Sequence, residues 1–281
     1  MLAEPYVGFR ADNAFVARVV EIIRSGVESG RRVFLICCGA NSPDGQGIEL
    51  NGPHIDPRGN KLLATLSREA FETLSPHFVF GAFVQGVVLA EAGEEIESVY
   101  FPLSGMISIV VVMKDGKAIE TATVGRDGVF GAMVGFGPYI SRVRAIVQMP
   151  ITAIRVPSLQ FRKATQGSRE LQNLCIDYNE FLLVQARISA ACNALHKVEA
   201  RFCRWLLQTR ETTGSDTITL TQEFLSEMLG VRRTSVTDVA SKLQGAGVIS
   251  YSRGVIRIID LLALKALSCE CYETLLEQRA I

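Results

Sequence analysis

The sequence predicts an α+β protein in which a domain of short strands precedes a long helix and a C-terminal helix-turn-helix unit. Short β-branched runs separated by turn residues fill residues 85–157, which is typical of a small β-sandwich or barrel. Apolar side chains then follow heptad spacing through residues 168–196, and two short helical segments joined by a glycine occupy residues 221–244. With 281 residues, the chain is long enough for two domains with separate cores.

The composition excludes several classes of protein. With 48% hydrophobic and 21% charged residues, the chain has the balance of a globular protein, not of a disordered, collagen-like or rod-like one. Its longest apolar runs, 33–38 and 106–113, are shorter than the roughly 18 residues that a membrane-spanning helix needs. The N-terminal residues lack a basic flank before an apolar core, so no secretory signal is expected. Seven cysteines, an odd number, then indicate reduced thiols in the cytoplasm.

Residues 1–60 form a leader without a clear domain pattern. A short helix is predicted over residues 12–23, and residues 39–60 are rich in Gly, Asn, Pro and Asp, which indicates a loop or linker. The first domain is expected to span residues 61–166 and to begin with a helix over residues 61–75. The apolar residues on one side of that helix are Leu62, Leu63, Leu66, Ala70, Phe71 and Leu74.

The strands of the first domain are predicted from short apolar and β-branched runs. Asp115-Gly116 is predicted to form a two-residue hairpin loop, because both residue types tolerate a positive φ. A glycine-rich stretch at residues 125–137 separates the later strands from the earlier ones. The predicted strands are residues 87–89, 99–101, 107–113, 118–124, 145–148 and 151–156.

Residues 167–196 are predicted to form a dimerisation helix. Apolar positions recur with alternating spacings of three and four residues over more than three heptads, which favours a coiled-coil pairing of two copies. The alternative is a single helix that packs on its own strand domain. The predicted dimer seam consists of Leu171, Leu174, Tyr178, Phe181, Gln185, Ile188, Cys192 and Leu195.

A C-terminal domain is predicted over residues 197–281, beginning with a helix over residues 197–212. Thr221 is a good N-cap for a following short helix, and Gly230 supplies the tight turn after it. A second helix then runs from about Arg232 to Gln244, and two strands around Arg253-Gly254 form a β-wing. The inward-facing residues of the second helix are Val236, Val239, Ala240 and Leu243.

This arrangement points to DNA, because the N-terminal part of the second helix in such a unit enters the major groove. Arg233 is the candidate for two hydrogen bonds to a guanine, and Asp238 can accept from cytosine. The alternative is a helical domain with an incidental Arg-Arg pair. The predicted base-reading residues are Arg233, Thr234, Thr237 and Asp238, and the predicted phosphate contacts are Thr221, Arg232, Ser235, Lys242 and Arg253.

The formal net charge of zero hides an uneven distribution. Residues 230–257 carry five basic side chains against one acidic side chain, whereas residues 60–130 carry five basic against nine acidic ones. A basic C-terminal region beside an acidic first domain is compatible with DNA binding and predicts modest non-specific affinity.

The whole order of elements resembles the Crp/Fnr family of bacterial transcription regulators over residues 61–272. The resemblance is carried by LTQEFLSEMLGVRRTSVTDVASKLQGAGVISYSRG, and by VGRDGVFGAMVG before the long helix. It implies a jelly-roll-like, double-stranded β-roll of the cyclic-nucleotide-binding type, a dimerisation helix and a winged helix-turn-helix. It also implies a homodimer on a two-fold symmetric DNA site, with RNA polymerase as a further partner. The guanine-reading arginine of the family falls on Arg233.

The sequence departs from the family pattern at two places. Thr234 stands where a glutamate often follows the arginine, and Asp238 replaces a basic residue, so a different DNA sequence is expected. In the β-roll, the family's Gly-Glu-Leu segment holds a ribose, and its carboxylate is missing here. Cyclic AMP is therefore not expected as a cofactor, and the β-roll takes another effector, transmits a partner's signal or scaffolds the dimer. The candidate effector pocket is Gly131, Ala132, Met133, Arg142 and Arg144.

No enzyme is predicted, because the sequence lacks a Ser/His/Asp constellation, a phosphate loop and an HExxH motif. Cys269-Glu270-Cys271 raises the idea of a redox or metal switch, although two thiols without a ligand role are the preferred interpretation. His54, His77 and His196 are scattered and are expected to be surface or packing residues. A second hypothesis for function is a thiol- or ligand-sensing module that acts through a protein partner and carries a vestigial DNA-binding domain.

Overall fold

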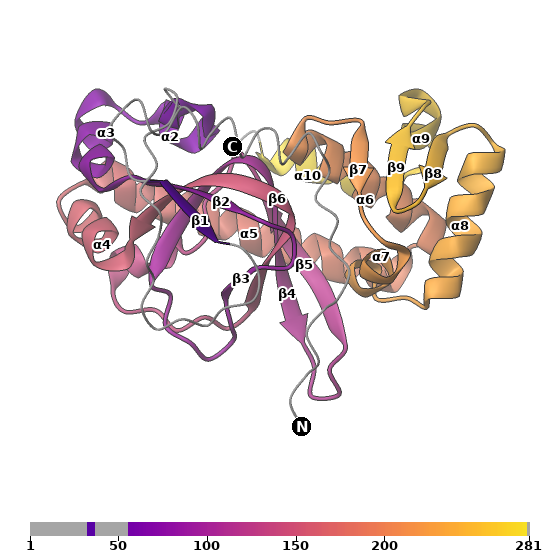
Figure 1. Cartoon of the computed structure of the whole chain (residues 1–281), viewed down its shortest axis with the longest axis horizontal. Helices are drawn as coiled ribbons and strands as arrows, with labels where there is room; N and C mark the ends of the chain where they lie inside the picture. Colours follow the sequence, from indigo (N-terminus) through magenta and orange to yellow (C-terminus); the bar gives the residue numbers. More distant parts are fainter. Residues whose placement is uncertain (1–32, 37–55, 280–281) are drawn as a thin grey trace.

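The computed structural model describes residues 56–279 and the backbone of one further strand, β1 (Val33–Ile36). The predicted helix at residues 12–23 and most of the predicted loop at residues 39–60 lie outside the described residues. Along the chain, a strand domain is followed by a long helix, which lies behind the sheet in Figure 1, and then by a helical domain that carries a small sheet. No helix in the described part of the chain is long and apolar enough to cross a bilayer.

The first domain is built on a largely antiparallel sheet with strand order β1-β2-β6-β4-β5, in which β3 also pairs with β6. β1 and β2 are parallel, and every other pair in this sheet is antiparallel. This sheet confirms the predicted strand-rich domain. Its further strands are β2 (Val79–Phe83), β3 (Val88–Ala90), β4 (Ser98–Val112), β5 (Ala118–Val124) and β6 (Arg144–Pro157).

Two pairs of predicted strands are single long strands in the structure. Residues 99–101 and 107–113 belong largely to β4, and residues 145–148 and 151–156 belong to β6. The turn signals between them are irregularities in one β4–β6 ladder, whose register shifts on both sides of Ser104. Gly105 adopts φ 71° there, and a Cβ at this position would lie 2.1 Å from the Pro150 carbonyl oxygen. The glycine is therefore a point of close backbone approach and not a chain reversal.

The hairpin between β4 and β5 has a longer loop than predicted. The Met113 N–H donates to the Lys117 carbonyl at 2.7 Å, so that three residues, 114–116, form the loop. Gly116 has a positive φ of 85°, whereas Asp115 does not, since Arg253 is the one described non-glycine residue with a positive φ. Instead, the Asp115 carboxylate accepts the Lys117 N–H at 3.1 Å. The prediction of a two-residue loop at Asp115-Gly116 is therefore wrong.

The helix predicted over residues 61–75 is interrupted. α2 (Lys61–Thr65) ends because its C-cap, Leu66, has an extended backbone, and Ser67 then caps α3 (Arg68–Leu74) by accepting the Ala70 N–H. A serine hydroxyl that bonds to the backbone in this way starts a new helix instead of continuing the old one. The other short helices of this domain are η1 (Pro57–Gly59), η2 (Ser75–His77), η3 (Ala132–Phe136) and α4 (Ser158–Gln166).

The long helix α5 (Arg169–Leu195) begins at its Ser168 cap, close to the predicted start, but half of the predicted dimer seam faces its own chain. Leu171 and Tyr178 belong to the core of the first domain, and the Gln185 amide pairs with both backbone groups of Thr123 at 3.1 Å. Cys192 is fully buried with cysteines from the C-terminal segment.

The seam is therefore corrected at four positions. Heptad spacing shows that one face of a helix is covered, but not by which partner. Here the chain's own strand domain and C-terminal helix cover that face, so the buried residues are unavailable to a second copy. The four are Leu171, Tyr178, Gln185 and Cys192; of the others, Leu174, Phe181 and Ile188 are partly buried and Leu195 is 78% exposed.

The C-terminal domain contains the predicted helix-turn-helix and wing. Apolar residues from its helices and from a three-stranded sheet of order β7-β9-β8 form a second core, which includes Trp205, Leu225 and Val236. The elements are α6 (Val198–Thr213), β7 (Thr217–Thr219), α7 (Gln222–Leu229), α8 (Arg233–Gly245), β8 (Ile249–Ser252), β9 (Val255–Ile258), α9 (Leu261–Leu267) and α10 (Cys271–Arg279).

Candidate nucleic-acid interface and a cysteine–histidine cluster

The turn between α7 and α8 is built from local signals in the sequence. The Thr221 hydroxyl accepts the Phe224 N–H at 3.2 Å and starts α7. Gly230 ends that helix with φ 61°, a left-handed conformation that glycine adopts without steric cost. α8 follows directly after Arg232, and its buried Val236, Ala240 and Leu243 hold it against the domain core. α8 lies at the outer end of the molecule, away from the strand domain (Figure 1).

Three of the four predicted base-reading residues project to solvent from the first two turns of α8. Arg233, Thr234 and Asp238 are exposed, whereas Thr237 is half-buried. The Thr237 hydroxyl lies 3.0 Å from Gln222 Oε1 and 3.1 Å from the Arg233 carbonyl oxygen, so its hydrogen bonds are made within the protein. The exposed face therefore offers a guanidinium, a hydroxyl and a carboxylate, groups that match base edges in the major groove.

The predicted phosphate contacts surround this face. Arg232 is exposed at the N-terminal end of α8, where the unpaired N–H groups of the first turn attract anions. Arg253 and Gly254 form the wing turn with φ 51° and φ 79°, which confirms the predicted turn between β8 and β9. Lys242 is exposed but lies 2.6 Å from Glu199, so a phosphate would have to compete with this ion pair. Thr221 is exposed with its hydroxyl in the α7 cap, and Ser235 is partly buried.

The predicted effector residues of the strand domain are placed on two elements. Gly131 adopts φ 88° at the start of η3, where Ala132 is buried, and a Cβ on Gly131 would lie 3.2 Å from the Ser98 carbonyl oxygen. Arg144 at the start of β6 lies 2.9 Å from Glu91, and Arg142 is exposed. None of the five candidate residues lines the cavity beneath α10 or the cavity beside α3.

The strand domain contacts the DNA-binding domain through β5. The Glu120 carboxylate accepts hydrogen bonds from Ser108 at 2.5 Å and from the Trp205 indole at 2.9 Å. Desolvation raises the pKa of Glu120 to about 7, against the lowering effect of these two donors and of the Arg204 charge. A Cβ at Gly230 would lie 2.9 Å from the Ile119 side chain. The β4–β5 hairpin therefore touches both the first helix of the C-terminal domain and the turn before the recognition helix.

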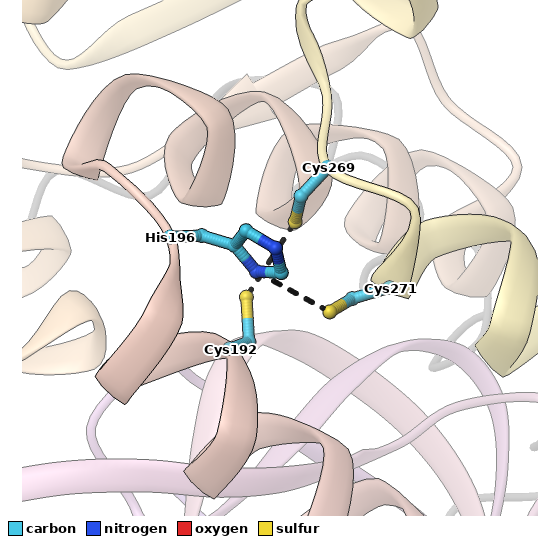
Figure 2. Close-up of side chains that lie close together, drawn as sticks. All are labelled: Cys192, His196, Cys269 and Cys271. Atoms are coloured by element: carbon cyan, nitrogen blue, oxygen red, sulfur yellow. Dashed lines mark hydrogen bonds between the residues drawn. The ribbon is translucent and has the colours of Figure 1, made fainter.

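The most concentrated group of reactive side chains lies at the far end of α5. Cys192, His196, Cys269 and Cys271 place their sulfur and ring nitrogen atoms within 4.8 Å of one another. Figure 2 shows the four side chains pointing toward a common centre from two segments of the chain. The sulfurs of Cys192 and Cys269 are 3.5 Å apart, and the Cys271 sulfur is 3.6 Å from His196 Nδ1.

The cluster favours a thiolate at one position. The hydrogen bond from Cys269 lowers the pKa of Cys192 to about 5, and the same pairing raises the pKa of Cys269. The negative Cys192 sulfur in turn raises the pKa of His196. In contrast, burial raises the pKa of both Cys175 and Cys203 to about 12, so these two thiols resemble ordinary core residues.

Sequence reasoning found only half of this cluster. It singled out Cys269 and Cys271 but placed Cys192 on the dimer seam and treated His196 as a surface or packing residue. The signal that was available is the spacing Cys192-x-x-x-His196, which places both side chains on one face of a helix. Combined with Cys269-x-Cys271, it gives two closely spaced ligand pairs, an arrangement typical of metal sites.

Comparisons with known proteins match both domains of this chain. Residues 81–168 match the family model of the cyclic nucleotide-binding domain, and residues 200–267 match that of the Crp-like helix-turn-helix domain. The two matches together span more than half of the chain. No curated protein matches the chain closely enough in sequence to count as a relative.

Solved structures share the fold at low sequence identity. FixK2 from Bradyrhizobium japonicum has a TM-score of 0.59 at 17% identity, covering 68% of this chain and 98% of its own. A transcriptional regulator of the CRP/FNR family from Thermus thermophilus has a TM-score of 0.56 at 24% identity, covering 67% and 97%. The c-di-GMP responsive regulator CLP from Xanthomonas campestris has a TM-score of 0.56 at 15% identity, covering 69% and 100%.

Proposed function

We propose that this chain, which belongs to the Crp/Fnr family of transcription regulators, binds a two-fold symmetric DNA site as a homodimer and regulates transcription there. The observation that carries the proposal is the exposed face of α8, with Arg233, Thr234 and Asp238 between the exposed Arg232 and the wing turn at Arg253. A guanidinium at the N-terminal end of a recognition helix can form two hydrogen bonds to guanine O6 and N7.

The dimer contact is proposed along the part of α5 that the chain leaves uncovered. Ile176 is 53% exposed and Leu183 is 41% exposed, and Ala190 continues the same seven-residue repeat. Leu195, a member of the predicted dimer seam, is 78% exposed at the end of the helix, but five residues beyond Ala190 it lies on another side of α5 and outside this stripe. Two such helices packed side by side would bury this stripe and place two copies of α8 about one DNA turn apart, roughly 34–36 Å.

The β-roll is proposed to respond to an effector or partner other than cyclic AMP, or to serve as a scaffold. Ala132 is buried where the family's carboxylate would meet a ribose, and an alanine cannot replace those hydrogen bonds. A signal in this domain has a physical route to DNA, because the Glu120–Trp205 hydrogen bond and the Ile119–Gly230 contact connect β5 to α6 and to the turn before α8. We therefore propose an allosteric regulator and not an enzyme.

The partners proposed for this mechanism are double-stranded DNA, a second copy of the chain and RNA polymerase, and the proposed location is the cytoplasm, where these partners meet. The alternative of a vestigial DNA-binding domain gains no support from the described residues, since cap, turn, recognition helix and wing are all formed. The exposed arginines at Arg232 and Arg233 also remain available for DNA.

Selection of bound sequences from a random duplex library, followed by affinity measurement at fixed salt, tests the proposal. We expect enrichment of an inverted repeat and a ratio of specific to non-specific affinity of about 10³ or more. Uniform, salt-sensitive binding without an enriched sequence would overturn the proposal in favour of a vestigial domain.

A further inference from the structure

We propose that Cys192, His196, Cys269 and Cys271 bind one thiophilic divalent metal ion, Zn²⁺, at the junction between α5 and the C-terminal helices. The ligand atoms already have nearly the separations that such an ion requires. Zn–S bonds of about 2.3 Å and Zn–N bonds of about 2.0–2.1 Å in a tetrahedron place two sulfurs about 3.8 Å apart and a sulfur and a nitrogen about 3.6 Å apart. The corresponding distances here are 3.5 Å for Cys192–Cys269 and 3.6 Å for Cys271–His196.

The four residues are held in place by secondary structure on both sides. Cys192 lies in the last turn of α5, and His196 is the C-cap of that helix, with its backbone N–H donating to the Cys192 carbonyl. Cys269 and Cys271 flank the start of α10, and the Tyr272 N–H donates to the Cys269 carbonyl. Each pair is therefore oriented by local hydrogen bonds before any ion binds.

The histidine has a partner that leaves the correct nitrogen free. His196 Nε2 lies 3.1 Å from Glu270 Oε1, whereas Nδ1 faces the Cys271 sulfur. When the Nε2–H donates to this carboxylate, the imidazole is held as the tautomer whose Nδ1 lone pair points at the sulfurs. Metal-binding histidines commonly have such a carboxylate on the nitrogen that does not bind the metal. Glu270 is accordingly a positioning residue.

The surroundings suit a closed, structural site. The three cysteines are between 0% and 8% exposed, and Ile188 and Ala200 pack against them. Three thiolates and a neutral imidazole around Zn²⁺ carry a net charge of −1. Arg201 and Arg204 on α6 are each 6% exposed, and the positive charges of both interact with Cys192. Arg201 also donates to the Leu229 carbonyl and Arg204 to Gln208, but the Nε–H of each arginine has no acceptor among the described residues, so an anionic centre beside Cys192 would stabilise both buried charges.

The donor set distinguishes between metals. Three sulfurs and one nitrogen in a tetrahedron are typical of structural zinc, whereas oxygen donors would be needed for Mg²⁺ or Ca²⁺. All four atoms lie within 4.8 Å of one another, which suits a single ion. Binding requires no oxidant: each sulfur binds Zn²⁺ as a thiolate by donating an electron pair, and the proton of every cysteine that is still a thiol passes to solvent.

The ion would fasten the end of α5 to the last helices of the DNA-binding domain. Cys192 and Cys269 are 77 residues apart in sequence, and α6, α7, α8 and the wing lie between them. Metal binding would therefore fix the orientation of the recognition helix relative to α5. This regulatory consequence rests on the proposed function in DNA binding, but the metal site itself does not.

The first experiment measures metal in the full-length chain by inductively coupled plasma mass spectrometry. We expect about one zinc per chain in the wild type, and loss of that zinc in a Cys269→Ser, Cys271→Ser double variant. Cys203→Ser removes a buried thiol outside the cluster and should retain the zinc, as should a Cys37→Ser, Cys38→Ser variant. A wild-type chain that neither contains nor takes up zinc, or a double variant that keeps it, would overturn the proposal.

A second measurement does not depend on the folding of a ligand variant. Replacement of zinc by Co²⁺ in the wild-type chain should give thiolate-to-metal charge-transfer bands and the d–d bands of a tetrahedral site. Glu270→Gln keeps all four ligands, so we expect the same Co²⁺ spectrum with zinc affinity weaker by about 10–100-fold. An octahedral Co²⁺ spectrum, or a Cys192–Cys269 disulfide in the chain prepared with reductant and zinc, would contradict the assignment.

DNA affinity is then compared between the zinc-loaded and the chelated chain on the selected duplex. We expect tighter specific binding with zinc. Equal affinity in both forms would overturn the regulatory role alone, since metal content is measured separately. Absence of any enriched duplex would overturn the DNA-binding proposal and leave the result on zinc intact.

Discussion

The indole nitrogen of Trp205 donates a hydrogen bond of 2.9 Å to the Glu120 carboxylate, and this bond joins β5 of the strand domain to α6 of the DNA-binding domain. Trp205 is 2% exposed and belongs to the core of its domain. Glu120 is partly buried and also accepts from Ser108. A titratable group therefore lies at one of the contacts between the two domains.

Stability is expected to fall with rising pH through this contact. Desolvation raises the pKa of Glu120 from its ordinary value of 4.5 to about 7. Between these two values the folded chain holds the proton more tightly than the unfolded chain, so the unfolding free energy decreases as the pH rises from 4.5 to about 7 and then levels off. Glu120→Gln removes this titration. Between about pH 5 and pH 8, the unfolding free energy of the variant should therefore decrease less than that of the wild type, by on the order of 2 kcal/mol.

Urea denaturation at both pH values measures this difference. Glu94→Gln, at an exposed position of the same domain, serves as the control and should follow the wild type. An identical pH dependence in Glu120→Gln and the wild type would show that Glu120 does not carry the effect.

Arg233→Ala should weaken specific DNA binding by about 1–3 kcal/mol and relax the preference at one base pair of each half-site. The guanidinium is exposed at the start of α8, where it can donate two hydrogen bonds to one guanine. Fluorescence anisotropy on the selected duplex and on single-base variants measures both effects. Arg68→Ala, at an exposed arginine of α3 that pairs with Glu72, should leave affinity and specificity unchanged.

Charge on the uncovered stripe of α5 should break the dimer without unfolding the chain. Ile176→Glu combined with Leu183→Glu places two carboxylates where the second helix is proposed to pack, at positions that are 53% and 41% exposed in the single chain. We expect the dimer dissociation constant to rise at least about tenfold, since truncation of a central interface residue typically costs more than 1 kcal/mol. Sedimentation velocity measures the change.

Leu159→Glu is the matched control for this prediction, because Leu159 has a similar exposure of 54% but belongs to a different helix, α4. It should sediment as the wild type does. If the stripe variant remains a dimer and the control behaves in the same way, the dimer contact lies on another face.

The helix-turn-helix was predictable because its signals are local. The Thr221 cap, the left-handed Gly230 and the wing turn at Arg253-Gly254 each depend on neighbours within a few residues. The dimer seam was less predictable, because the same heptad spacing is compatible with packing against a partner helix or against the chain's own sheet. Tyr178 and Gln185 pack against the strand domain of their own chain, and the spacing of apolar residues along the helix does not reveal that contact.

The cysteine–histidine cluster was only half predictable, because it depends on a contact between residues 77 positions apart. Cys269 and Cys271 drew attention through their own spacing, but nothing near them in sequence identifies Cys192 as their neighbour. Likewise, a Ser104-Gly105 turn signal cannot be distinguished by sequence from a glycine that lets two strands approach closely.

Gly105→Ala should destabilise the chain much more than Gly116→Ala, although both glycines have a positive φ. Gly105 has φ 71° and Gly116 has φ 85°, so each alanine pays a conformational cost of about 1–2 kcal/mol. At Gly116 nothing lies within 4 Å of the added Cβ. At Gly105 the Cβ would lie 2.1 Å from the Pro150 carbonyl oxygen, and β4 and β6 would have to separate. Thermal or urea unfolding compares the stability of the two variants. Equal losses of unfolding free energy would mean that β4 and β6 can move apart at this point without an energetic penalty.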